Sequence, residues 1–104
     1  MGSSDDAVVS RDDHLAGLLA AVARGDRDAF SALYDASCGH VFAAIRTVIA
    51  GDLHREHVLH ETYLSIWQHA PAWDAAHGTA MSWCLMLARR CAAAGRSDPE
   101  TPAA

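Results

Sequence analysis

Glycine–aspartate pairs divide this chain into apolar segments that repeat with a helical period. Gly25-Asp26 and Gly51-Asp52 each place a residue suited to a helix end before one suited to a helix start. Ahead of the first pair, four apolar residues follow the i, i+3, i+4, i+7 spacing of one helix face. These residues are Leu15, Leu18, Leu19 and Val22. No segment alternates with the period of two that a strand needs, so the chain is predicted to be all-α.

Two helices are predicted in the first half of the chain. The first begins at a cap on Asp12 or Asp13 and ends at Gly25 in the left-handed conformation. The second begins at a cap on Asp26 and continues for about 24 residues, to near Gly51. Its predicted buried residues are Phe30, Leu33, Tyr34, Val41, Ile45, Val48 and Ile49.

Two further helices are predicted after Gly51. The third begins at Asp52 and ends at Pro71, and residues 70–78 are too rich in Pro, Asp and Gly to continue it. The fourth begins at a Thr79 cap and is closed by Gly95. The predicted buried residues are Val58, Leu59, Tyr63, Ile66 and Trp67 in the third helix, and Met81, Trp83, Leu85, Leu87 and Ala88 in the fourth. Because short links force neighbouring helices to pack, we expect a compact bundle of four helices.

Composition indicates where the folded domain begins and ends and which kinds of partner it can bind. We expect a disordered acidic arm at 1–12, one helical domain at 13–97 and a disordered tail at 98–104. The net charge is −5 and every basic residue is Arg, so tight unaided binding to DNA is not expected. No apolar run approaches the roughly 18 residues that span a bilayer, and no signal peptide opens the chain. A cytoplasmic protein without membrane insertion is predicted.

The order of motifs resembles one known family. GDRDAFSALYDASCGHVFAAIRTVIAG (25–51) resembles region 2.1 of extracytoplasmic-function (ECF) sigma factors of the sigma-70 family. DLHREHVLHETYLSIWQHAPAWD (52–74) resembles their regions 2.2 and 2.3, and GTAMSWCLMLARRCAAAGR (78–96) the start of region 2.4. The resemblance covers about residues 14–97 in one register. It implies a sigma-70 region 2-like helical bundle that acts in transcription initiation.

The resemblance also implies partners for particular residues. In this family the region 2.2 helix docks on the clamp helices of the RNA polymerase β′ subunit, and regions 2.3 and 2.4 capture bases of the melted −10 promoter element. The implied polymerase-binding residues are Glu56, His57, His60, Glu61 and Leu64. The implied residues for weak contact with single-stranded promoter DNA are Trp73, Asp74, His77, Thr79, Arg89 and Arg90. Packing remains an alternative role for Trp73, and the helix dipole an alternative partner for the two arginines.

Several positions depart from the family pattern. Where the family commonly has Asp and Gln in region 2.2, this chain has His57 and His60. Cys91 and Ala94 stand where a further Arg and an Asp are usual, and Gly95 is expected to stop the helix. Region 4, which reads the −35 element, is absent from the 104 residues. Region 2.4 is therefore interpreted as degenerate, and polymerase docking as weakened.

Seven histidines and three cysteines raise the question of a metal or catalytic site. His57 and Glu61 have the i, i+4 spacing of two ligands on one helix, but one pair is only half of a zinc site. Cys84 and Cys91 share a helix face, where we expect them to act as small apolar residues. We predict no metal, no cofactor and no enzymatic activity.

Three functional hypotheses stay open. In the first hypothesis, the chain is a transcription factor that engages the RNA polymerase core. In the second, it is a stand-alone regulatory module that binds another protein, for example as a decoy for an anti-sigma factor. The third hypothesis is that the 104 residues are a piece of a longer factor.

Overall fold

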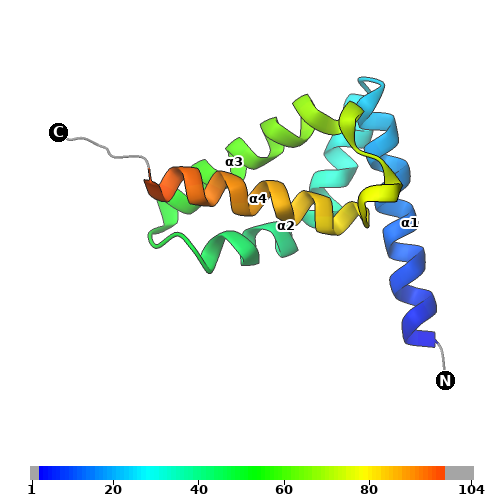
Figure 1. The fold of residues 1–104 in the computed structure, drawn as a ribbon, viewed down its shortest axis with the longest axis horizontal. Coiled ribbons are helices and arrows are strands. Elements are labelled where there is room, and N and C mark those ends of the chain that lie inside the picture. Colours follow the sequence, from blue (N-terminus) through cyan, green and yellow to red (C-terminus); the bar gives the residue numbers. More distant parts are fainter. Residues whose placement is uncertain (1–2, 98–104) are drawn as a thin grey trace.

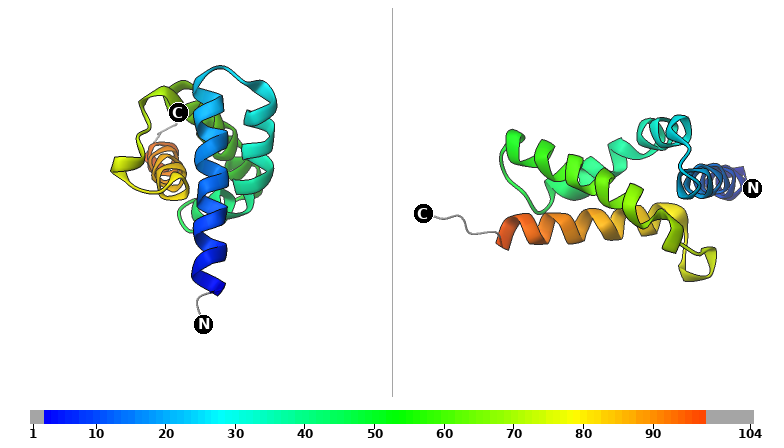
Figure 2. Two further views of the ribbon diagram at one scale, coloured as in Figure 1. Left: turned by 90° about the vertical axis from the view of Figure 1, so that its right-hand side faces the viewer. Right: turned by 90° about the horizontal axis from the view of Figure 1, so that it is seen from above.

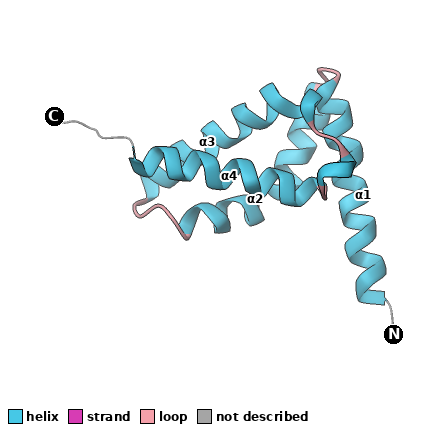
Figure 3. Cartoon of the chain, in the orientation of Figure 1, coloured by secondary structure: helices cyan, strands magenta, loops and turns pink. Residues whose placement is uncertain are grey.

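Four α-helices and two short 3-10 turns form the fold in the computed structural model, which describes the backbone of residues 3–97 and the side chains of residues 12–76 and 78–95. The α-helices are α1 (Ser3–Ala23), α2 (Arg27–Arg46), α3 (Asp52–His69) and α4 (Ala80–Ser97). The 3-10 turns η1 (Ala70–Ala72) and η2 (Ala75–His77) lie between α3 and α4. No strand occurs within residues 3–97, and the predicted all-α bundle is confirmed (Figure 3).

Each of the four helices contacts the other three, so they pack around one shared core. In Figure 1, α4 lies along α2 and α3, while α1 crosses one end of the molecule and its N-terminal part extends past the other helices. Figure 2 shows the same crossing from two further sides. The fully buried side chains come from all four helices and include Leu15, Leu19, Leu33, Val41, Ile45, Val58, Ile66 and Cys84.

The link between α1 and α2 has the predicted local structure. Gly25 adopts φ +86° and donates its N–H to the Val22 carbonyl at 2.8 Å, while the Asp26 N–H reaches Ala21 at 3.1 Å. These two bonds make the Schellman ending of a helix. The Asp26 carboxylate then accepts the Ala29 N–H at 3.0 Å, which caps α2 as predicted.

The start of α1 differs from the prediction. The helix begins at Ser3, so residues 3–12 have helical backbone where a disordered arm was expected, and neither Asp12 nor Asp13 is its N-cap. The Asp12 carboxylate instead accepts backbone N–H groups of α4. A carboxylate can cap the helix it faces as well as the one that carries it, and sequence spacing shows only the second option. The predicted tail at 98–104 lies outside the described residues.

The end of α2 comes earlier than predicted. The helix stops at Arg46, although Val48 and Ile49 still pack against the core from the following turn. Thr47 donates its hydroxyl to the Ala44 carbonyl at 2.6 Å, and the β-branched run that follows lowers helix propensity. Arg55 then donates its Nε–H to the Ile49 carbonyl at 2.7 Å, which ties the turn to α3.

The role predicted for Gly95 is wrong, because α4 continues through it to Ser97. A Cβ atom at Gly95 would lie 3.2 Å from both His54 Nε2 and Val58 Cγ2 of α3. The glycine therefore allows two helices to approach closely and does not end one. At the other end of α4, the predicted cap is confirmed, since Thr79 Oγ1 accepts the Ser82 N–H at 3.1 Å.

Candidate functional site

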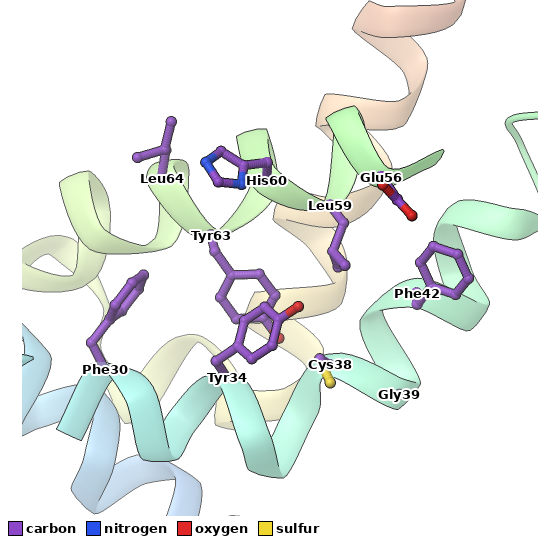
Figure 4. A pocket seen from close by; sticks show the side chains of 10 residues that line it. All are labelled: Phe30, Tyr34, Cys38, Gly39, Phe42, Glu56, Leu59, His60, Tyr63 and Leu64. Atoms are coloured by element: carbon purple, nitrogen blue, oxygen red, sulfur yellow. The ribbon is translucent and has the colours of Figure 1, made fainter. Parts of the chain in front are cut away.

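A groove lined mainly by apolar side chains runs between α2 and α3 and has a volume of about 640 Å³ (Figure 4). Helix α2 supplies Phe30, Tyr34, Cys38, Gly39 and Phe42; α3 supplies Glu56, Leu59, His60, Tyr63 and Leu64. The aromatic residues of α2 are four or eight positions apart, so they share one face of the helix. Three predicted polymerase-binding residues, Glu56, His60 and Leu64, therefore share one wall of this groove.

Aromatic contacts hold the two walls together at the base of the groove. The Phe30 ring meets Tyr63 edge-on at 6.2 Å and Trp67 at 5.2 Å between centroids. On the solvent side of this base, the Tyr34 ring lies 4.7 Å from that of Tyr63 at a tilt of 59°. Such pairs are geometrically specific and stabilise beyond their burial, so the groove has a preformed floor.

The rim of the groove is exposed and apolar in part. Leu64 is 48% exposed and Tyr34 38% exposed, although Tyr34 was predicted to be buried. Apolar side chains stay exposed where the apolar stripe of a helix is wider than the surface that the neighbouring helices cover. Gly39 adds no side chain to the lining, and a Cβ there would meet nothing within 4 Å.

The other two predicted polymerase-binding residues border a second groove, on the α4 side of the same exposed face of α3. His57 and Glu61 line this second groove, between α3 and α4, with Val58, Cys91 and Gly95. His57 Nε2 is 4.0 Å from Glu61 Oε2, and both side chains are more than half exposed. An exposed i, i+4 pair of this kind contributes little to stability. The five residues thus lie on one exposed face of α3, with a groove on each side of it.

The predicted DNA-binding residues also fall into two groups. Trp73, Asp74 and Thr79 belong to the segment between α3 and α4, whereas Arg89 and Arg90 are exposed farther along α4. Ten residues of helix separate Thr79 from Arg89, a distance of about 15 Å along the axis. The side chain of His77 lies outside the described residues. The loop and the two arginines are therefore separate along the axis of α4.

Within the loop, polar side chains are engaged in its own structure. Asp74 Oδ1 accepts the Ala76 N–H at 3.0 Å, and Thr79 caps α4. Trp73 is half-buried against the core, and its indole N–H is buried without a hydrogen-bond partner. Most of the Trp73 ring is thus committed to packing, the alternative that the sequence left open.

Cys84 and Tyr63 are the described groups whose titration is clearly perturbed. Burial raises the pKa of the Cys84 thiol to about 12, and the charge of Asp12 adds to the shift. Burial also raises the pKa of Tyr63, against the opposing effect of its hydrogen bond with Ser37. Both groups are neutral at physiological pH, and the predicted apolar role of Cys84 is confirmed. Cys91 is half-buried.

In the described part of the chain, no three His, Cys, Asp or Glu side chains are arranged to hold a metal ion. No helix within it is both long and apolar enough to cross a membrane.

Sequence reasoning missed most of the groove between α2 and α3. Phe30, Tyr34, Cys38 and Phe42 recur at intervals of four, but the same spacing describes a core-facing stripe. It also missed Asp12, for which no local signal exists, because its hydrogen-bond partners are 68 and 69 residues away.

The fold and its surfaces define a class: a small all-α bundle with an exposed helix face and a largely apolar groove beside it. Comparisons with known proteins give the family. Over 80 residues, 77% of this chain, it is 38% identical to the ECF RNA polymerase sigma factor SigK of Mycobacterium ulcerans. Over 73 residues it is 37% identical to SigK of Mycolicibacterium vanbaalenii and 35% identical to SigK of Mycobacterium tuberculosis. The chain belongs to the ECF sigma factors, with a region 2-like bundle.

The chain spans less than half the length of these relatives, since the alignments cover 43%, 37% and 39% of them. No family model matches the chain. No solved structure is significantly similar to it.

Proposed function

We propose that this chain provides the RNA polymerase-engaging part of an ECF sigma factor and acts by binding in transcription initiation. The observation that carries the proposal is the alignment with relatives named ECF RNA polymerase sigma factors, at 35–38% identity over 70% or more of the chain. In this proposal the chain acts in the cytoplasm, needs no cofactor and catalyses no reaction.

The groove between α2 and α3 is the proposed polymerase-binding surface. A helix of the β′ clamp would lie against its apolar rim, as amphipathic helices do in grooves of this kind. Leu64 and Tyr34 offer exposed apolar surface, and Glu56 offers an acceptor for a basic side chain. His57 and Glu61 face α4 and are proposed as flanking contacts of the same partner.

Contact with the −10 element is proposed to be weak and to rest on the loop and on Arg89 and Arg90. The two guanidinium groups are exposed and suit phosphate oxygens. The net charge of −5 opposes nonspecific attraction to DNA. The half-buried Trp73 leaves only part of its ring for stacking on a base.

Substitution of two exposed leucines of α3 tests whether the groove between α2 and α3 binds the polymerase. Leu64 lines the groove, while Leu53 is 84% exposed at the start of the helix and lies outside the lining. Leu64→Ala is expected to weaken binding to a β′ clamp-helix fragment by about tenfold, as loss of an interface anchor does. Leu53→Ala removes the same atoms and is expected to leave the affinity unchanged.

Binding to the fragment is measured by isothermal titration calorimetry. Equal effects of the two substitutions would show that the groove is not the docking surface. If the unmodified chain did not bind the fragment or the polymerase core, the proposed function itself would be wrong.

A second candidate is a regulatory module that binds an anti-sigma factor without promoter recognition. It is favoured by where the departures from the family pattern lie: His57, His60 and Ala94 are exposed, while the core is intact. Competition distinguishes the two functions. A decoy would release a full-length sigma factor from its anti-sigma factor and would not bind the polymerase core.

A further inference from the structure

We propose that Asp12 is a positioning residue for the loop of residues 73–79. From α1, its carboxylate accepts two backbone N–H groups of α4 and thereby orders the first turn of α4 and the loop that leads into it. The inference deepens the proposed function, since it rests on that loop being a DNA contact, but the ordering itself is testable without DNA.

The hydrogen bonds that carry the inference join residues far apart in the chain. Asp12 Oδ2 lies 3.4 Å from the Ala80 nitrogen, and Asp12 Oδ1 lies 3.3 Å from that of Met81. The first N–H groups of a helix have no partner within the helix itself. Thr79 accepts the N–H of Ser82, so Thr79 and Asp12 between them serve three consecutive N–H groups.

Packing holds Asp12 in position against α4. Leu15, one turn later in α1, is 2% exposed, and Ala80 and Cys84 of α4 are fully buried. Asp12 itself is half-buried. A negative charge at the N-terminus of a helix also interacts favourably with the helix dipole, and partial burial strengthens that interaction.

Trp73 packs against the core and fixes the first end of the loop, and the rest of the loop has few long-range contacts. Its hydrogen bonds are short-range: Trp73 N–H to Ala70, Ala76 N–H to Asp74, and Gly78 N–H to Ala75. Gly78 has φ +126°, a conformation that a glycine adopts without strain and leaves as easily. The orientation of the loop therefore depends on how firmly its two ends are held, and Asp12 holds the α4 end.

The alternative reading gives Asp12 the opposite effect. A helix N-terminus attracts phosphate, so a carboxylate already seated there would repel a DNA backbone and reduce binding. The two readings make different predictions for Asp12→Asn, which keeps one of the two acceptor oxygens and loses the charge: positioning predicts somewhat weaker binding of DNA, and repulsion predicts tighter binding. Asp13 is exposed, makes no hydrogen bond or ion pair with α4, and provides the matched control for the loss of one negative charge.

Amide hydrogen exchange by NMR tests the ordering in the full chain. In Asp12→Ala, exchange at Gly78, Ala80 and Met81 is expected to become roughly two- to thirtyfold faster, the range for loss of an N-cap. Asp12→Asn keeps one of the two acceptor oxygens and is expected to raise exchange less than Asp12→Ala does, while Asp13→Ala is expected to exchange as the unmodified chain does. The core amide of Ile66 reports global stability, so a general loss of folding would appear there as well.

The inference is overturned if exchange at Gly78 is the same in Asp12→Ala as in Asp13→Ala, or if it rises only in proportion to exchange at Ile66. Affinity for a −10 single-stranded oligonucleotide gives the second measurement. Asp12→Ala should bind more weakly by a similar factor, and Asp12→Asn by a smaller one. Tighter binding by both Asp12 variants would establish repulsion and overturn positioning. If the unmodified chain did not bind the oligonucleotide, the DNA contact would be wrong, while the exchange data would still decide the ordering.

Discussion

At the scale of single residues, the buried contact between Ser37 and Tyr63 joins α2 to α3. Ser37 Oγ lies 2.7 Å from the Leu33 carbonyl oxygen and 2.6 Å from Tyr63 Oη. Since the single hydroxyl proton of Ser37 is donated to Leu33, the Tyr63 hydroxyl donates to Ser37. Both polar groups are satisfied in a site without access to water, at the base of the groove between α2 and α3.

Removing one partner of this contact should cost more than removing the other. Tyr63→Phe leaves Ser37 bonded to Leu33 and is expected to lower the free energy of unfolding by about 1 kcal/mol. Ser37→Ala leaves the buried Tyr63 hydroxyl without an acceptor, at an expected cost of about 1–3 kcal/mol. The double variant should cost less than the sum of the single ones. Urea unfolding of the unmodified chain, the two single variants and the double variant gives the four free energies of unfolding. If the losses of the two single variants add up to that of the double variant, the assigned hydrogen bond is contradicted.

At the scale of elements, glycines distinguish the open groove from the tight helix contact. Gly39 of α2 borders the groove between α2 and α3, where a Cβ would meet nothing within 4 Å. Gly95 of α4 lies where a Cβ would be 3.2 Å from Val58 Cγ2, and Val58 is only 2% exposed. A buried valine has little room to move, so the approach of α3 to α4 depends on the missing side chain.

The two glycines should therefore respond differently to alanine. Gly39→Ala is expected to raise the free energy of unfolding by up to about 1 kcal/mol, the difference in helix propensity. Gly95→Ala gains the same propensity but crowds Val58, so it is expected to be neutral or destabilising. Thermal unfolding of the two variants provides the measurement. A stabilisation by Gly95→Ala equal to that by Gly39→Ala would show that α3 and α4 are not in close contact there.

At the scale of the whole molecule, the buried thiol and phenol make stability depend on pH in the alkaline range. The folded chain holds the pKa of Cys84 near 12, compared with an ordinary value of 9.0, and the pKa of Tyr63 is raised as well. A raised folded-state pKa contributes stability that is complete below the unfolded-state pKa and is lost as pH rises toward the folded-state value. The free energy of unfolding should therefore fall as pH rises from about 9 toward 12.

Cys84→Ala tests the thiol's share of this dependence. The variant should be less stable at neutral pH, because it leaves a small cavity, but its stability should decline less steeply at alkaline pH. Cys91→Ala, at a half-buried thiol on the same helix, is the control and should keep the original slope. Urea unfolding at a series of pH values from neutral upward measures both. Identical slopes in all three proteins would contradict a contribution from Cys84.

The sequence alone determined the number of helices, their buried faces and most of their ends. Leu15, Leu19 and Val22 are buried as their spacing predicts, and Asp26 and Thr79 cap the helices they precede. These features depend on residues within one or two turns of each other, so a local pattern is sufficient to predict them. The order of motifs also indicated the family that the comparisons confirm.

Only the tertiary structure decided which surfaces exist. It divided the five predicted polymerase-binding residues between the grooves on either side of α3, exposed Tyr34 at the rim of a groove and made Gly95 a contact point. It also brought Asp12 to the first turn of α4. Each of these depends on how the helices cross, which is set by contacts between residues far apart in the chain and is not encoded in the period of any one helix.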